Sequence, residues 1–187
     1  KQGRLQETGQ RKPGRRGCSS HVLRGARTGG WSLVNGFGID GNWVGIKDGD
    51  PRAVALFNRH YSARRGGDRI RYGMSGPGQT MTLLTVRCDA LYIWLNNQVE
   101  RYDNQEGLNC TIFRNEGPIL SSELILEAEA LAWQRWPGLR LFTYVWDSKV
   151  ESVNPGYCFK MAGWKTCGRN KDGRLTILEK LPGVGVW

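Results

Sequence analysis

The sequence predicts an α/β domain in which helices pack on a mixed β-sheet. Short apolar and β-branched runs alternate with helix-like segments, in the order β-α-β-β-β-α-β-α-β-β. A chain of 187 residues is long enough for one compact domain with a proper core. No stretch approaches the roughly 18 continuous apolar residues that span a bilayer. We therefore expect a globular protein with no membrane partner.

The first strand and helix are marked by local signals. Residues 42–46 read as a short strand. Asp50 and Pro51 then supply an N-cap and a proline at the first helical position. Apolar residues after Pro51 recur at helical spacing as far as His60, which predicts a helix of about three turns. Further strands are expected at residues 80–86, 91–95, 108–113, 139–146, 164–168 and 174–181.

Two later helices lie between these strands. Ser121 and Ser122, followed by Glu123, are predicted to cap the clearest helix of the chain, which Pro137 ends. A second, short helix is expected from residue 154 to residue 163, before the last two strands pair across a turn rich in Gly, Asn and Asp.

Positive charge is concentrated at the N-terminus of a chain whose formal net charge is +10. Residues 1–30 contain eight lysines and arginines against Glu7 alone. Such a segment is predicted to be a disordered basic arm ahead of one domain at residues 31–187. It suits phosphate backbones, where neutralised phosphates release counterions. A solubilising or mistranslated leader is the alternative.

Cysteine and histidine usage argues against a metal site. The five cysteines are an odd number with no C-x-x-C pair, and only two histidines are present. We interpret the cysteines as mostly buried apolar residues of a protein in a reducing cytoplasm.

The turn after residue 113 is a candidate anion site. It contains Arg114 and Gly117, followed by Pro118 and Ile119. The order of elements around it resembles the GNAT acyltransferase fold, where a turn of pattern R/Q-x-x-G-x-G/A binds a CoA pyrophosphate at a helix N-terminus. Pro118 lacks an N–H and Ile119 replaces a small residue, so the match is partial. A plain β-to-α turn explains it equally well.

A second departure concerns the leaving-group acid. GNAT enzymes often place a tyrosine four residues before the final Gly-aromatic pair, and here that position is Phe159. Phe159 cannot donate a proton. This favours a transferase other than a standard acetyltransferase.

Other motifs narrow the choice of family. They are Asn-Arg-His-Tyr-Ser at residues 58–62, Asp147 after a buried strand, and Gly-Tyr-Cys-Phe…Ala-Gly-Trp at residues 156–164. Over residues 54–181 the chain resembles the Mom family of phage DNA-modifying proteins. These GNAT-fold relatives convert adenine in DNA to an N6-carbamoylmethyl form, which helps phage DNA escape restriction. The host cytoplasm is then the expected location.

The resemblance implies roles for individual residues. His60 and Tyr61 would face the reacting centre, Asp147 would orient or deprotonate the adenine amino group, and Tyr157 would donate a hydrogen bond or a proton. The anionic part of the group donor would be held by Arg114, Gly117, Ser121 and Ser122. Each residue also has a structural interpretation: a satisfied histidine, a turn-capping aspartate, a helix-capping serine, a core tyrosine.

Basic residues near the motif are expected to grip double-stranded DNA. They are Arg59, Arg64, Arg65, Arg69, Arg71 and Lys149. A solvated loop is the alternative for the Gly- and Arg-rich residues 64–79.

The donor is not identified by the sequence. Acyl-CoA and a glycine derivative are candidates, and iron is not excluded by the resemblance, although no two-His-one-carboxylate set can be assembled. Two other functions compete: a conventional acetyltransferase acting on a protein or small amine, and a non-catalytic DNA-binding module.

Overall fold

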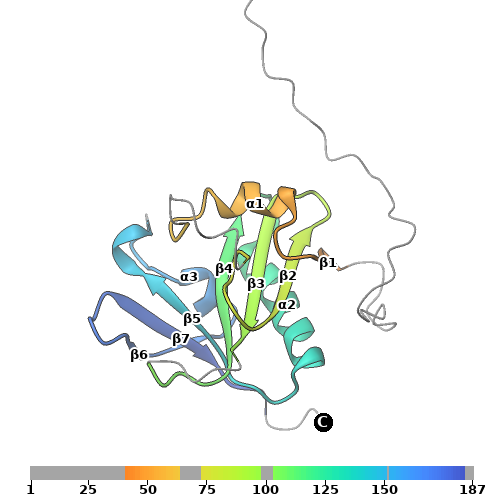
Figure 1. The fold of residues 1–187 in the computed structure, drawn as a ribbon. Helices are drawn as coiled ribbons and strands as arrows, with labels where there is room; N and C mark the ends of the chain where they lie inside the picture. The colour runs from red at the N-terminus through yellow and green to blue at the C-terminus, as the bar shows by residue number, and fades with distance from the viewer. Residues whose placement is uncertain (1–40, 64–72, 98–102, 151, 184–187) are drawn as a thin grey trace, which may run out of the picture. The chain divides into compact units, whose positions relative to one another are not determined.

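A computed structural model describes residues 41–63, 73–97, 103–150 and 152–183 of the chain. The fold is a seven-stranded mixed sheet with helices on both faces (Figure 1). The predicted basic arm lies outside the described residues. The same is true of four residues expected to contact DNA: Arg64, Arg65, Arg69 and Arg71. No helix in the described part combines the length and apolarity needed to cross a membrane.

The predicted order of elements is confirmed. The strands are β1 (Trp43–Ile46), β2 (Gln79–Thr85), β3 (Ala90–Asn96), β4 (Leu108–Asn115), β5 (Leu141–Trp146), β6 (Lys165–Arg169) and β7 (Leu175–Lys180). The helices are α1 (Pro51–Phe57), α2 (Ser121–Arg135) and α3 (Tyr157–Met161), and the 3-10 helix η2 (Asp147–Lys149) follows β5. Neighbouring strands in the sheet run β1-β2-β3-β4-β5-β7-β6. All pairs are antiparallel except β4 with β5.

Alternation along the central strands builds two cores, one on each face of the sheet. On β3, Tyr92 and Trp94 point into a core completed by α2 and α3, whereas Leu91 and Ile93 point into a core completed by α1. All four side chains are fully buried. Figure 1 shows α1 in front of the sheet and α2 behind it.

Helix α1 is shorter than predicted. The Asp50 cap is confirmed, since its carboxylate accepts from the Arg52 amide at 2.9 Å. The helix ends at Phe57 because the amides of Arg59 and His60 bond three residues back instead of four, as in a turn. His60 therefore lies in the turn after the helix, and not on a helix face.

Helix α2 begins without a side-chain cap, so the predicted capping by Ser121 and Ser122 is wrong. The N-cap residue is Leu120, whose side chain cannot accept a hydrogen bond. Ser121 is the first helical residue, and its hydroxyl instead accepts from the Asn115 amide at 3.1 Å. The amides of Leu120, Ser121 and Ser122 make no hydrogen bond among the described residues.

Strands β4 and β5 diverge. Their parallel pairing covers only Leu108–Cys110 against Leu141–Thr143. Beyond this point β4 continues to Asn115 beside β3, and β5 continues to Trp146 beside β7. A β-bulge leaves Thr111 unpaired where the strands separate. Figure 1 shows the two strands starting side by side and moving apart, with the turn after α1 between their carboxyl ends.

A buried ion pair ties α2 to the C-terminal hairpin. Glu129 is 2% exposed and accepts from the Lys180 ammonium and the Trp164 indole. Lys180 also donates to the Ala162 carbonyl at 2.7 Å. Burial raises the pKa of Glu129, while the hydrogen bonds from Lys180 and Trp164 oppose the rise.

Helix α3 approaches the sheet closely at Gly156. This residue has φ 73°, and a Cβ there would lie 2.6 Å from a Leu178 methyl group and 3.2 Å from Val145. Glycine permits both the left-handed backbone and the contact.

The burial of the cysteines differs from the prediction. Of the four that are described, only Cys110 is buried, whereas Cys88 and Cys158 are half-buried and Cys167 is exposed. Cys88 has φ 58° in the tight β2–β3 turn, and Cys167 lies on the edge strand β6, so neither position is enclosed.

Candidate functional site

The opening between β4 and β5 is bordered by His60 and Tyr61. Their rings lie 4.2 Å apart, centroid to centroid. His60 interacts with the Phe113 carbonyl on β4, and Tyr61 with the Trp146 amide at the end of β5. The two side chains therefore bridge β4 and β5 where these strands are no longer paired. Three segments far apart in the sequence meet at this point.

His60 is held in one neutral form. Its Nδ1 accepts from the Ser62 amide at 3.2 Å and lies 2.8 Å from the Ser62 hydroxyl. The proton of the neutral ring is then on Nε2, facing the Phe113 carbonyl. Burial, and next the positive charge of Arg114, lower the pKa of His60 to about 4. His60 is consequently uncharged at neutral pH.

We predict that His60 titrates far below an ordinary histidine. Its pKa is lower in the folded chain than the usual 6.5, so the stability it contributes is complete above pH 6.5 and is lost as pH falls through about 4. The measurement is the pH dependence of its ring proton shifts by NMR. The chain has two histidines, so a His21→Gln variant leaves one signal to follow. A midpoint at the ordinary imidazole value would contradict the structure.

Tyr61 remains a protonated phenol. Burial raises its pKa, the Trp146 amide opposes this, and Cys110, Cys158 and Asp147 add to the rise. The residue is nevertheless 39% exposed. Tyr61 is therefore a partly exposed, protonated phenol within electrostatic range of Asp147.

Asp147 leaves β5 at its carboxyl end and begins η2. One carboxylate oxygen, Oδ2, accepts from the Thr176 hydroxyl at 2.8 Å and pairs with Arg169 at 3.0 Å. The other oxygen, Oδ1, is buried and has no hydrogen-bond partner among the described residues. A buried acceptor without a partner is costly, so such an atom calls for an explanation. Oδ1 thus retains the capacity to accept one further N–H group.

Arg169 and Thr176 were not predicted from the sequence. Thr176 follows Asp147 by 29 residues, on β7, and Arg169 is on the neighbouring strand β6. The predicted β6–β7 hairpin was the feature that could have revealed them. Pairing of Trp146 with Leu175 brings the turn end of this hairpin next to Asp147.

Two thiols lie near the apex of the opening. Cys110 is the last β4 residue paired with β5, and burial raises its pKa to about 12, although the nearby hydroxyl groups of Tyr92 and Thr143 oppose the rise. Burial also raises the pKa of Cys158 on α3. Both thiols are neutral at neutral pH, and both lie near enough to Tyr61 to raise its pKa.

Tyr157 is not linked to this cluster by a hydrogen bond or a ring contact among the described residues. It is the first residue of α3 and is 54% exposed. Phe159, by contrast, is buried against Phe113 and Trp164.

Arg114 is engaged within the protein. It pairs with Glu116 and donates to the Arg59 carbonyl at 2.6 Å. Glu116 also accepts two bonds from Arg59, at 2.8 and 2.7 Å. These bonds, with Arg59 first, lower the pKa of Glu116 to about 2. Arg59 and Arg114 thereby fix the turn after α1 onto the end of β4, and an anion would compete with Glu116 for both.

Gly117 is a structural position. Its amide donates to the Asn115 side chain at 2.9 Å, and a Cβ would lie 2.6 Å from the Asp89 carboxylate. The Glu116 amide donates to the Asp89 carbonyl at 2.7 Å. Donors for an anion therefore come from the next residues, the unpaired amides at the start of α2, where the helix dipole favours negative charge.

Lys149 is exposed at the end of η2, with its ammonium 5.7 Å from the centre of the Trp146 ring. Among the six basic residues expected to contact DNA, the structure describes Lys149 and Arg59.

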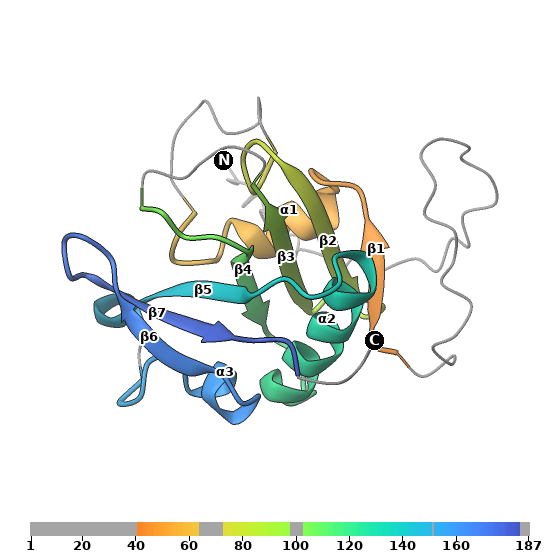
Figure 2. The same cartoon turned by 90° about the horizontal axis from the view of Figure 1, so that it is seen from below.

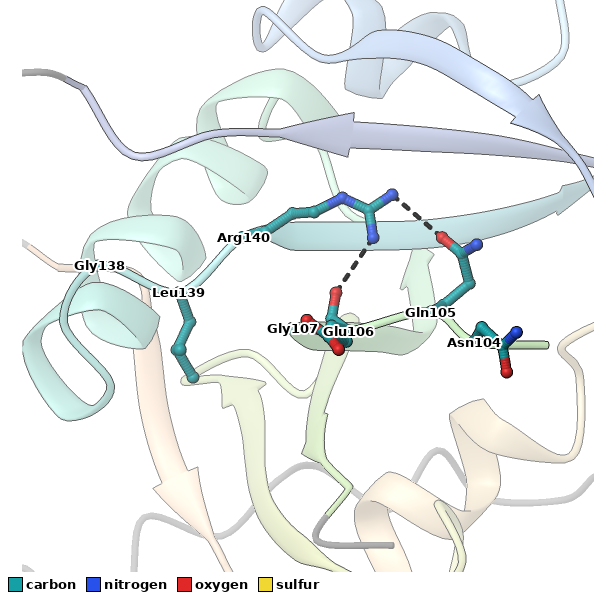
Figure 3. Close-up of a pocket in the computed structure, with 7 residues that line it drawn as sticks. All are labelled: Asn104, Gln105, Glu106, Gly107, Gly138, Leu139 and Arg140. Atoms are coloured by element: carbon teal, nitrogen blue, oxygen red, sulfur yellow. Dashed lines mark hydrogen bonds between the residues drawn. The ribbon is translucent and has the colours of Figure 1, made fainter. Parts of the chain in front are cut away.

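A pocket of about 490 Å³ lies elsewhere, at the beginnings of β4 and β5 (Figure 3). Arg140 lines it, and each of its three guanidinium nitrogens donates within the protein: Nε to Glu179, Nη1 to the Glu106 carbonyl and Nη2 to the Gln105 side chain. The predicted site residues are absent from its lining. We assign the candidate site to the β4–β5 opening because His60, Tyr61 and the unpartnered Asp147 Oδ1 lie there.

No cluster of three metal-ligating side chains occurs in the described ranges. No protein-family model, curated protein sequence or solved structure matches this chain. The site is therefore interpreted from its own geometry.

Proposed function

We propose that this chain is a transferase with a GNAT-like fold that adds a small carbamoylmethyl or acyl-type group to the N6 amino group of adenine in DNA. The observation that carries the proposal is the convergence of His60, Tyr61 and Asp147 at the β4–β5 opening. Protection of phage DNA from restriction would be the biological result.

The architecture supports a GNAT-like assignment. Four antiparallel strands are joined by one parallel pair to a second antiparallel unit, and the parallel pair separates after three residue pairs. A bulge occurs at the point of separation, and bulges are frequent beside active sites. Open α/β sheets bind ligands at the carboxyl ends of their strands.

The chemistry matches the groups at the opening. Adenine N6 is a poor nucleophile because its lone pair is delocalised into the ring. In the proposed step the N6 lone pair bonds to the donor carbon, the donor's leaving group departs with the electrons of the broken bond, and the N6 proton passes to Asp147 Oδ1. Arg169 and Thr176 hold the other oxygen, so Asp147 is already oriented.

His60 and Tyr61 contribute polar groups without net charge. The Tyr61 hydroxyl stabilises charge that develops on the donor through a hydrogen bond, while neutral His60, whose ring nitrogens face Ser62 and the Phe113 carbonyl, supports the Tyr61 ring. The target base must leave the duplex stack, at a cost of a few kcal/mol. The exposed ring of Tyr61 provides a surface on which it can stack.

The α2 N-terminus is the part of the site suited to an anionic donor. Its amides lack a side-chain cap, and Ser121 and Ser122 stand in the first turn. A CoA thioester fits this chemistry. Standard acetyl transfer is less well supported, because Phe159 is buried in the core where that family's leaving-group acid would stand.

The test is expression of the full chain in bacteria beside a plasmid, followed by digestion of the plasmid to nucleosides and mass spectrometry. We expect a heavier derivative of deoxyadenosine. Unmodified deoxyadenosine alone, with soluble protein present, would refute the proposal. Turnover of acetyl-CoA with peptides or small amines would instead favour an acetyltransferase.

A further inference from the structure

The excess of positive over negative charge among the described residues lies in one region. From residue 147 to residue 176 they include six lysines and arginines against two aspartates, whereas the rest have eight basic against ten acidic residues. Four of the six form what we call the tip surface: Lys149, Arg169, Lys171 and Arg174. The first follows β5, and the others lie on β6 and in the β6–β7 turn.

The tip surface lies at the same end of the sheet as Asp147. Pairing of Trp146 with Leu175 places the β6–β7 turn just beyond the end of β5. Figure 2 shows this turn extending past β5. Arg169 connects the two features, since one guanidinium nitrogen pairs with Asp147 and another donates to the Gly173 carbonyl at 2.8 Å.

The cations of the turn are exposed and oriented. Arg174 is 69% exposed, and Asp172 holds its guanidinium with a further bond to its backbone amide at 3.2 Å. Side chains fixed in this way lose little conformational freedom on binding. Two aspartates do not neutralise four cations, so the tip surface keeps a net positive charge.

We propose that the tip surface binds the phosphate backbone of duplex DNA on the β5 side of the opening. This inference rests on the proposed function and extends it to a second contact region, besides the turn after α1. A base that reaches Asp147 brings its flanking phosphates to the rim of the opening, and phosphate contacts fix register without reading sequence. The hairpin then positions the strand while Asp147 acts on the base.

The test is binding of the full chain to a labelled duplex, followed by fluorescence anisotropy over a range of salt concentrations. The variant Lys171→Gln/Arg174→Gln removes two tip cations but keeps Arg169. Loss of two phosphate contacts should reduce the slope of log K against log salt by about 1.8.

The matched control is Lys47→Gln/Arg52→Gln. Arg52 is held by Asp50, two residues earlier, through the same three kinds of bond that Asp172 makes to Arg174. The control loses equal charge from a region where acids balance bases, so its slope should stay as in the wild type.

The possible outcomes distinguish failure of the inference from failure of the proposed function. An unchanged slope in the tip variant, or an equal reduction in the control, would overturn the inference while the proposed function stands. An equal loss of binding to phosphatidylserine vesicles would overturn the assignment to DNA. A wild-type chain that does not bind the duplex would overturn both. Binding that depends on the tip, without any modified nucleoside in the plasmid assay, would sustain the inference and refute the transferase.

Discussion

Replacement of Asp147 by Asn should lower the yield of modified deoxyadenosine by about 10²–10⁴-fold, the range expected when a general base is lost. Asparagine keeps the size of the side chain and can still accept from Thr176, but it cannot take a proton and loses the pair with Arg169. Modified and unmodified nucleosides from equal amounts of plasmid give the ratio.

The matched control is Asp50→Asn. This aspartate also pairs with an arginine, Arg52, but it caps α1, and asparagine caps helices equally well. Its yield should equal that of the wild type. If Asp147→Asn modified DNA at the wild-type level while folded, Asp147 would not be the base.

Replacement of Lys180 by Met should destabilise the fold by about 3–5 kcal/mol, because Glu129 is left in the core without its cation. Urea unfolding measures the free energy. Lys165→Met makes the same chemical change at an exposed residue of β6 with no ion pair among the described residues, and it should stay within about 0.5 kcal/mol of the wild type.

The deficit of the Lys180 variant should depend on pH. Burial raises the pKa of Glu129 and Lys180 opposes that rise, so without Lys180 the pKa increases further. A carboxyl whose pKa is higher in the folded than in the unfolded chain is stabilised by acid. The deficit should therefore shrink from about pH 7 to about pH 5. A deficit that grows on acidification would contradict this account of the pair, and Glu129→Gln/Lys180→Met should recover part of the loss.

The sequence predicted the element order because its signals were local. Asp50 and Pro51 begin α1 as expected, and apolar runs coincide with β2 to β5. The end of α1 was not predictable, because it depends on contacts that His60 and Tyr61 make with β4 and β5, far along the chain. The predicted cap of α2 was wrong for a similar reason: the Ser121 hydroxyl instead accepts from the Asn115 side-chain amide.

The sequence named candidate site residues without showing how they lie in space. Tyr61 of the motif at residues 58–62 lies near enough to Asp147 for the carboxylate to raise its pKa, which their separation in sequence could not establish. Arg169 and Thr176 were missed because strand pairing, and no motif, brings them to Asp147. Arg114 was predicted as an anion ligand, but the sequence did not reveal that Glu116 and Arg59 already engage it.

The most direct measurement is tandem mass spectrometry of the nucleosides from plasmid made beside the wild-type chain and beside Asp147→Asn. We predict a heavier deoxyadenosine from the wild type only, whose added mass stays with the adenine base when the glycosidic bond breaks. An added mass on another base or on the sugar, or deoxyadenosine that is unmodified in both samples, would contradict a transferase that acts on the adenine amino group.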